Sequence, residues 1–283
     1  MFHEPSSNPG GHLKQTVLGL SWATIGVGIA IVAPQVVSAP ARGNLAVQDA
    51  PAEPDQGRAF YFTRAVYTVL GQSEGWRQGR YGKGWWTDWP KADIQFVMGL
   101  THLTNLDAYE EDNLIRFDDP EIRRFPFVYA LEVGYMNLTD SEVLGLREYL
   151  MAGGFLVIDD FWGLREWHNF EQQMYRVFPE YPIIDIPMDH AVMHAFYEID
   201  EILQVPARGR GINFGRPTWE DPSDTVPRVR GVFDDEGRLI VIINYNTDLG
   251  DAWEWAEDPW YPLDKANFAY QLGINMIMYA MTH

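Results

Sequence analysis

The stretch Gly153–Gly163 constrains the fold more than any other part of this 283-residue chain. It opens with two glycines, continues as the wholly apolar run Phe155–Ile158, and then reaches Asp159 and Asp160. An apolar run this short, bounded by glycine and by charge, is typical of a strand that is buried on both faces of a parallel sheet. Ligand sites of open α/β sheets lie just outside the carboxyl ends of such strands. The two aspartates therefore stand where a site is expected.

The segments before this strand predict a βαβ unit. Phe125–Val133 has the pattern of a strand, and a helix starting after Thr139 or Asp140 ends at the glycine pair. Glu142 lies close to the capping-box position, and glycine is common just after a helix. A strand, a helix and a second strand in this order give a parallel pair with a right-handed crossover. We therefore expect an α/β fold with a mostly parallel sheet.

Further elements extend over residues 59–283, which we expect to form one domain. The expected strands are Ala59–Thr68, Pro182–Ile186, Val229–Phe233 and Arg238–Asn244, and the further helices start at Pro90 and cover Arg165–Phe178 and Lys265–Met281. We expect the helix after Pro90 to bury an apolar stripe of Ile94, Val97, Met98, Leu100 and Leu103. Two tryptophan-rich loops, at 71–89 and 245–260, complete the domain.

Composition removes several classes of chemistry. The chain has no cysteine, which excludes disulfides, thiolate metal sites and a cysteine nucleophile. Its formal net charge of −19 makes it a poor nucleic-acid binder. An acidic domain can attract a basic soluble carrier protein by long-range steering, although solubility alone also explains the charge.

The amino-terminal 58 residues predict a membrane anchor followed by a linker. Residues 1–15 form a polar tail, 16–37 are free of charged side chains, and 38–58 are rich in alanine, proline and polar residues. About 20 apolar residues span a bilayer, whereas the apolar core of a signal peptide has about 7–15. A cleaved signal peptide ending near Ala39 or Ala41 is the alternative. We favour an uncleaved signal anchor, which places the protein in the bacterial inner membrane as a single-pass protein with its domain on the periplasmic side.

Four small residues of the anchor share one helical face and can pack closely on another membrane helix. They are Gly19, Ala23, Gly26 and Ala30. The exposed-loop tryptophans are candidates for partner docking, since aromatic residues are enriched at interfaces. They are Trp76, Trp85, Trp86, Trp89, Trp253 and Trp255.

The best polar constellation combines carboxylates and histidines at predicted loop ends. Its members are Asp159, Asp160, His190, His194, Asp248, Asp251 and Glu254. If His190 and His194 lie on a helix, both rings face one side, and the group can hold a divalent metal and activate water. The alternative is structural, with the aspartates capping helices and turns. The spacing matches no strong metal motif.

Ordered motifs along residues 59–283 resemble the bacterial domain of unknown function 4159 family. The segments that carry the resemblance are RAFYFTR, PKADIQFVMGL, DDPEIRRFPFVYALEVGYMNLTDSEVLGLREYLMAGGFLVIDDFWG, RVFPE, IPMDHAVMHAFYEID, YNTDLGDAWE and ANFAYQLGINMIMYAMTH. The resemblance implies the fold of class I glutamine amidotransferases, a flavodoxin-like three-layer α/β sandwich. In those enzymes a cysteine nucleophile follows the strand equivalent to Phe155–Ile158. This chain has Asp159 and Asp160 there, so amidotransferase activity is excluded.

These observations favour a non-catalytic protein, a pseudo-enzyme without a cofactor. We expect a membrane-anchored accessory or scaffold subunit whose domain docks on the extracytoplasmic face of a larger integral membrane complex, and energy-transducing complexes fit this expectation. The alternative is a metal-dependent hydrolase or carbohydrate-processing enzyme that uses Asp159, Asp160, His190 and His194.

Overall fold

The computed structural model describes residues 60–71 and 82–283. The predicted tail, membrane anchor and linker of residues 1–58 lie outside the described residues, and with them Gly19, Ala23, Gly26 and Ala30. Trp76 also lies outside them. Within the two described ranges, no helix combines the length and the apolar character that a membrane crossing requires.

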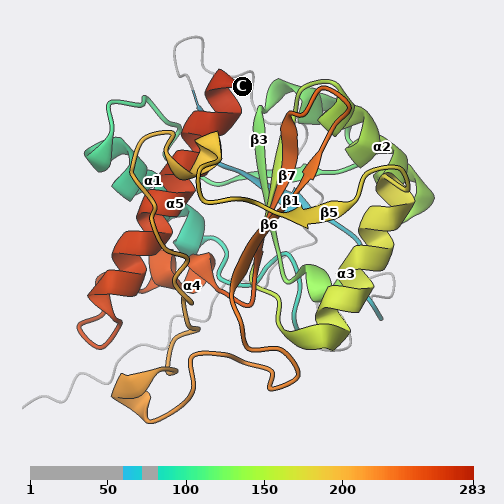
Figure 1. Ribbon diagram of the computed structural model, residues 1–283. Coiled ribbons are helices and arrows are strands. Elements are labelled where there is room, and N and C mark those ends of the chain that lie inside the picture. Colours follow the sequence, from blue (N-terminus) through green and yellow to red (C-terminus); the bar gives the residue numbers. More distant parts are fainter. Residues whose placement is uncertain (1–59, 72–81) are drawn as a thin grey trace, which may run out of the picture. The chain divides into compact units, whose positions relative to one another are not determined.

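A seven-stranded mixed sheet forms the centre of the domain (Figure 1). Its strands are β1 (Thr63–Val66), β2 (Asn113–Arg116), β3 (Phe127–Leu131), β4 (Phe155–Asp159), β5 (Ile183–Asp185), β6 (Arg228–Phe233) and β7 (Leu239–Tyr245). The strand order is β2-β1-β3-β4-β7-β6-β5. The first five strands in this order are parallel, whereas β6 runs antiparallel to both β7 and β5. The predicted α/β class and the mostly parallel sheet are therefore confirmed.

Helices cover both faces of this sheet (Figure 1). One face carries α1 (Lys91–Leu103), α4 (Leu249–Glu254) and α5 (Leu263–Thr282), and the other carries α2 (Asp140–Met151) and α3 (Gly163–Val177). Single 3-10 turns lie at η1 (Pro120–Arg124), η2 (Val133–Tyr135), η3 (Ala191–Met193) and η4 (Ile212–Phe214). The sheet is thus enclosed between two helical layers.

The central strands are buried on both sides, as the apolar run predicted. Every residue of β3, β4 and β7 is buried. Along β4, Phe155 and Val157 belong to the core under α1 and α5, while Leu156 and Ile158 belong to the core under α2 and α3. Such double burial is the reason why these strands are apolar throughout rather than alternating.

The turn between α2 and β4 follows local chemistry. Thr139 and Glu142 form the predicted capping box at the start of α2. After α2, Gly153 has φ 108°, a conformation that favours glycine. At Gly154 a Cβ atom would lie 2.3 Å from the ring of Tyr149, so the strand can start this close to the helix only with glycine.

The structure corrects the predicted apolar stripe of α1. Val97 and Leu100 are buried, but Met98 and Leu103 are 47% and 51% exposed, and Ile94 is also exposed. The helix instead turns Ala92, Asp93 and Phe96 inward, and Asp93 pairs with the buried Arg64. Apolar residues occupy more than one face of α1, so periodicity alone does not select the buried face. The helix α4 and the edge strand β2 were not predicted.

Candidate functional site

The carboxyl edge of the parallel strands gathers acidic residues from distant parts of the sequence. Glu132 directly follows β3, Asp160 follows β4, and Asp248 lies just after β7 at the start of α4. Asp88 comes from the loop before α1. Because parallel strands end at the same edge, residues that follow them in sequence become neighbours.

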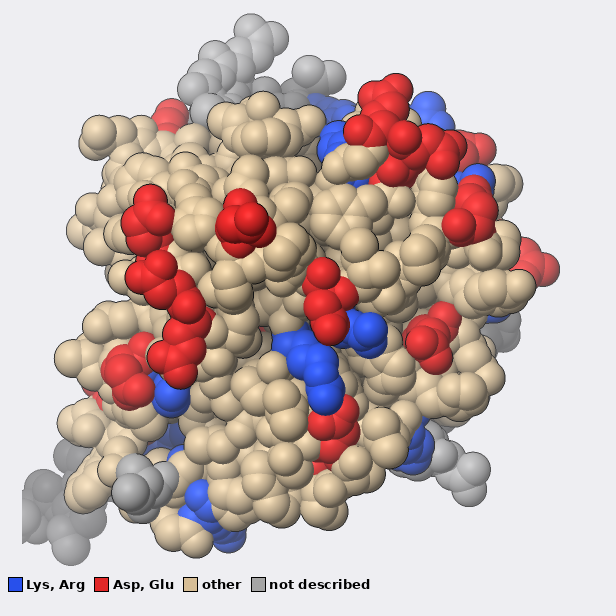
Figure 2. Space-filling view, viewed as in Figure 1, with Lys and Arg blue, Asp and Glu red and all other residues tan. Residues whose placement is uncertain are grey.

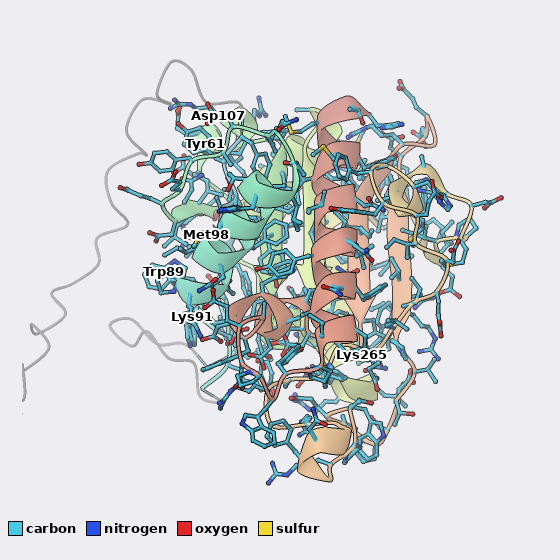
Figure 3. All side chains as sticks on the ribbon, turned by 90° about the vertical axis from the view of Figure 1, so that its left-hand side faces the viewer. Tyr61, Trp89, Lys91, Met98, Asp107 and Lys265 are labelled. Carbon is cyan, nitrogen blue, oxygen red and sulfur yellow. The ribbon has the colours of Figure 1, made fainter. Side chains whose placement is uncertain are left out.

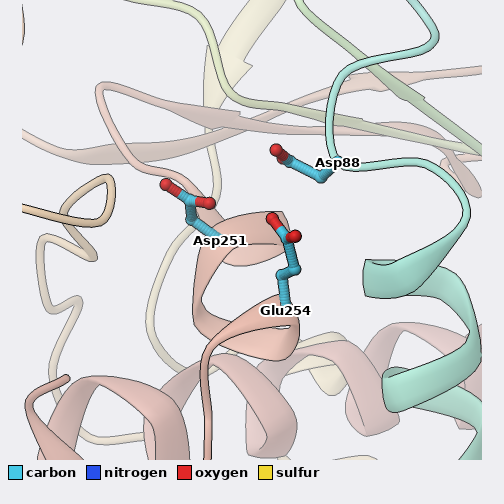
Figure 4. A group of neighbouring side chains, drawn as sticks. All are labelled: Asp88, Asp251 and Glu254. Atoms are coloured by element: carbon cyan, nitrogen blue, oxygen red, sulfur yellow. The ribbon is translucent and has the colours of Figure 1, made fainter. Parts of the chain in front are cut away.

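Three of these residues form a compact group that we call the carboxylate cluster, namely Asp88, Asp160 and Asp248. Each offers one carboxylate oxygen, and these oxygens all lie within 4.8 Å of one another. Asp160 and Asp248 are only 4% and 3% exposed, and Asp88 is partly exposed. Asp88 also belongs to a second such group, whose other members are Asp251 and Glu254 (Figure 4). We call Asp251 and Glu254 the outer carboxylates.

The backbone at this edge adopts an unusual conformation. Among the described residues, four that are not glycine have positive φ, namely Asp88 (59°), Glu132 (54°), Asp160 (46°) and Asn246 (57°). Glu132, Asp160 and Asn246 directly follow β3, β4 and β7, and Asp88 lies in the loop before α1. A left-handed conformation costs free energy for residues with a Cβ, and such residues concentrate at functional sites. The backbone therefore marks the same place as the carboxylates.

Asp159, the other aspartate at the end of β4, has a structural role. It is fully buried, and its Oδ2 accepts hydrogen bonds from the Tyr129 hydroxyl (2.7 Å), Leu249 N (2.9 Å) and Gly250 N (3.1 Å). These donors include two backbone groups at the start of α4. Asp159 thus fixes α4 against the sheet and does not cap α3, the helix that directly follows it.

The carboxylate cluster has few hydrogen-bond donors of its own. Asp160 Oδ1 accepts from Trp162 Nε1 at 2.8 Å, and Asp248 Oδ1 accepts from Asp251 N at 2.7 Å. Asp88 Oδ2 is buried without a hydrogen-bond partner among the described residues. Buried polar atoms nearly always have a hydrogen-bond partner. The unpartnered Asp88 Oδ2 therefore indicates either a bound ligand or a protonated carboxyl group.

Lys83 is the basic side chain that approaches this edge most directly. Its Nζ lies 3.0 Å from Glu132 Oε1 and 3.4 Å from Glu220 Oε2. Burial acts to lower the pKa of Lys83, but the surrounding carboxylates, Asp160 first and then Glu132, outweigh it and leave the pKa raised. Lys83 is therefore a positive charge that pairs directly with Glu132 and Glu220 and also acts on Asp160.

Burial and mutual repulsion disfavour the ionised forms of the aspartates. Burial, with the nearby charge of Asp160, raises the pKa of Asp159 to about 8. Burial also raises the pKa of Asp160 to about 7. The pKa values of Asp88 and Asp248 lie well above the ordinary range, first through burial and then through the neighbouring carboxylates. The protonated forms of these aspartates are therefore favoured unless a cation binds beside them.

The segment 206–226 covers the turn that follows β4. Ser223 Oγ accepts a hydrogen bond from Leu164 N at 2.9 Å, at the start of α3. A Cβ atom on Gly163 would lie 2.5 Å from Cγ of Asp221, and Gly163 has φ 71°. Glu220, which belongs to the same segment, forms an ion pair with Lys83. The strand-to-helix turn is consequently packed under this segment.

The histidines predicted for the site lie elsewhere, which corrects the Asp/His prediction. The His190 ring lies 5.6 Å from that of Tyr279, whose hydroxyl accepts a hydrogen bond from Leu239 N at the start of β7. Asp160 and Asp248 lie at the opposite edge of the sheet, where the parallel strands end. His194 instead contacts Glu198 at 2.6 Å. The prediction failed because η3 is a single turn and follows β5, not one of the central parallel strands.

The predicted docking tryptophans lie in different environments. Trp253 is buried against Phe96 and Tyr129, so it belongs to the core and not to a docking surface. Trp255 is partly buried, and the cationic groups of Lys91 and Arg208 lie 3.5 Å and 4.1 Å from its ring.

Trp85, Trp86 and Trp89 are partly exposed. The Trp85 ring lies 5.7 Å from that of Trp86 and 6.2 Å from that of Trp89.

Sequence reasoning found Asp160, Asp248, Asp251 and Glu254, but it missed other groups of the site. Glu132 follows β3 as Asp160 follows β4, so the same strand-end argument applied to it. Asp88 and Lys83 lie in a tryptophan-rich loop before α1, and only the tertiary fold brings that loop to the strand ends.

A comparison with curated proteins found no match. A comparison with protein families matched residues 78–281 to the family described as Domain of unknown function (DUF4159). The matched range includes α1 to α4, all but the last residue of α5, and every strand except β1. The chain therefore belongs to the family described as Domain of unknown function (DUF4159).

Proposed function

We propose that this protein is a non-catalytic, membrane-anchored accessory subunit, held in the bacterial inner membrane by residues 16–37, whose α/β domain docks on the periplasmic face of a larger membrane complex. One observation carries the non-catalytic part of this proposal. The position after β4 holds Asp160, which is buried and hydrogen-bonded to Trp162, and the segment 206–226 packs on the start of α3 that follows it. A nucleophile has to be accessible to its substrate, and this position is not.

The strand order supports the view that this position once belonged to an enzyme fold. The run β2-β1-β3-β4-β7 has the flavodoxin-like order 2-1-3-4-5 when its strands are numbered among themselves. This order agrees with an amidotransferase-like sandwich, in which the residue after the strand equivalent to β4 is the nucleophile. Asp160 has φ 46°, the left-handed conformation of a sharp strand-to-helix turn. The proposal therefore describes a retained backbone turn with a replaced side chain.

The outer face of α1 supplies the proposed docking surface. Ile94 and Met98 expose their apolar side chains on it. Figure 3 shows Met98 on this face and Trp89 at the start of the helix. Ile94 and Met98 are four residues apart and share one helical stripe. Exposed apolar groups that lie together mark interaction sites more often than scattered ones do. This surface offers an integral membrane partner an apolar contact.

Charge gives the proposed partner a second property. Acidic side chains form several patches on the face shown in Figure 2, with basic side chains between them. The net charge of −19 favours a basic partner, and a basic soluble carrier protein is the second proposed ligand of this domain. Such attraction acts mainly on the association rate and weakens as salt increases.

The rival proposal is a metal-dependent hydrolase or carbohydrate-processing enzyme. His190 and His194 lie away from the carboxylates and are no longer candidate ligands of its metal. Asp160, Asp248 and Asp251 remain candidate ligands. The rival centre would consist of oxygen ligands alone.

The test is purification of the full chain from its native membranes in a mild detergent, with a single substitution on the proposed surface. Met98→Asp places a charge on the outer face of α1, and Leu144→Asp is the matched control, since Leu144 is 58% exposed on α2 across the sheet. We expect the wild type and Leu144→Asp to comigrate with the same membrane subunits in native gels, and Met98→Asp to lose them. A wild type that always runs alone as a monomer contradicts the proposal.

A further inference from the structure

We propose that the carboxylate cluster of Asp88, Asp160 and Asp248 is a binding site for one hard divalent cation, Mg²⁺ or Ca²⁺. The site goes beyond the proposed accessory function and does not depend on it. Its three residues come from the loop before α1, the end of β4 and the start of α4. A cation there would join three segments that are distant in sequence.

The geometry suits one cation. The three carboxylate oxygens lie within 4.8 Å of one another. Oxygen ligands of Ca²⁺ and Mg²⁺ lie about 2.0–2.6 Å from the metal, so two ligands of the same ion are at most about 5 Å apart. The group also consists only of oxygen donors, which favours Mg²⁺ and Ca²⁺ over zinc or copper.

Unpartnered oxygens give an independent indication of a missing ligand. Asp88 Oδ2 is buried without a hydrogen-bond partner among the described residues. A Cβ atom on Gly250 would lie 3.1 Å from this oxygen and 3.6 Å from Asp248 Oδ1. Both carboxylates therefore lie close to the backbone of a residue that has no side chain. Beside the cluster, Glu132 is 1% exposed, and its Oε2 also lacks a partner in the described part of the chain.

No basic side chain forms an ion pair within 4.0 Å of the cluster in the described part of the chain, although the charge of Lys83 acts on Asp160 from a greater distance. The nearest basic groups make their ion pairs with other carboxylates: Lys83 with Glu132 and Glu220, Lys91 with Glu254, and Arg208 with Asp258. Within residues 60–71 and 82–283, no nitrogen of a basic side chain lies within 4.0 Å of a carboxylate oxygen of Asp88, Asp160 or Asp248. In their ionised form these buried carboxylates require a partner, and a divalent cation that binds in place of their protons supplies it.

The outer carboxylates are less suited to be the primary ligands. Both oxygens of Asp251 already accept hydrogen bonds, Oδ2 from Arg208 N and Oδ1 from Trp255 Nε1. Glu254 lies 3.7 Å from the Lys91 ammonium group. Figure 4 shows Asp251 and Glu254, both from α4, beside Asp88.

The experiment uses the purified full chain in detergent, first stripped of cations with a chelator. Calorimetric titration with Mg²⁺ and, separately, with Ca²⁺ measures affinity and stoichiometry, and thermal unfolding measures stabilisation. We expect one ion per chain and a higher melting temperature for at least one of the two cations. The tighter of the two identifies the physiological class of ion.

The decisive variant is Asp88→Asn, because the Asp88 side chain makes no hydrogen bond in the described structure and its loss should not impair folding. We expect it to weaken cation binding at least tenfold. In chelator its melting temperature should equal or exceed that of the wild type, because asparagine cannot ionise beside the neighbouring carboxylates. Asp264→Asn, at an exposed position on α5, is the matched control and should bind like the wild type.

Two outcomes would overturn the proposal. One is a wild type that shows neither heat of binding nor a change in melting temperature at millimolar Mg²⁺ or Ca²⁺. The other is cation binding that Asp88→Asn leaves unchanged. Both readouts are independent of comigration with membrane subunits, so failure of the cation site and failure of the accessory function are distinguishable.

Discussion

Asp159 offers the sharpest test of how the carboxyl edge is built, because its two oxygens have opposite environments. Oδ2 accepts three hydrogen bonds, from Tyr129, Leu249 and Gly250, and Oδ1 has no partner in the described structure. Asparagine can place its carbonyl oxygen at the position of Oδ2 and its uncharged NH2 group at the position of Oδ1. Alanine removes both.

The expected magnitudes follow from these contacts. Asp159→Ala leaves three buried donors unpaired, and at about 1–1.5 kcal/mol for each net hydrogen bond it should lower the free energy of unfolding by about 3–5 kcal/mol. Asp159→Asn should lower it little at pH 5. Only the alanine variant should therefore be severely destabilised.

The pH dependence adds a second expectation. The pKa of Asp159, raised to about 8 by burial and then by Asp160, lies above the ordinary value of about 3.9 in the unfolded chain. As pH rises, the unfolded chain releases this proton first, so wild-type stability falls between about pH 4 and pH 8. Asp160 and Asp248 are the charged groups that face Asp159, while Tyr129 donates to it. The Asp159→Asn variant lacks this loss, and its advantage should approach about 5 kcal/mol at most at pH 8.

The assay is urea unfolding followed by circular dichroism, at pH 5 and pH 8 in the presence of a chelator. The wild type, Asp159→Asn and Asp159→Ala are compared at both pH values. An asparagine variant that is as unstable as the alanine variant at pH 5 would contradict this role of Asp159, and so would one whose stability relative to the wild type does not change with pH.

Three further predictions concern packing, capping and the histidines. Gly134→Ala should cost about 3 kcal/mol in urea unfolding, because its Cβ would lie 2.3 Å from Cβ of Glu166; an unchanged midpoint would be inconsistent with this contact. Thr139→Ala should cost about 1 kcal/mol by removing one half of the capping box, whereas no loss would show that the box is dispensable. Replacing His190 and His194 together by glutamine should leave cation titrations unchanged, and weakened binding would place the histidines in the site after all.

Much of the fold could be predicted because its determinants are local. The apolar run Phe155–Ile158, the glycines before it and the capping box at Thr139 are each short in sequence, and each has its expected structure. Double burial of β4 follows from the same run. The orientation of α1 could not be predicted in this way, because Met98 and Phe96 are both apolar and only the neighbouring elements decide which one is buried.

The site was predictable only in part, for a related reason. Asp160 and Asp248 follow parallel strands, and the strand-end rule brings them together. Asp88 lies 72 residues before Asp160 in sequence and reaches it through a loop whose path no local pattern encodes. His190 and His194 were grouped with the aspartates on the assumption of a helix, and the chain forms one short turn there instead.

The most direct test of the carboxyl edge is a crystal structure of the protein grown with Mn²⁺, which binds oxygen ligands as Mg²⁺ does and scatters anomalously. We expect one anomalous peak within about 2.2 Å of carboxylate oxygens from Asp88, Asp160 and Asp248. The absence of a peak there, with the three side chains in their present positions, would show that protons rather than a cation balance this edge.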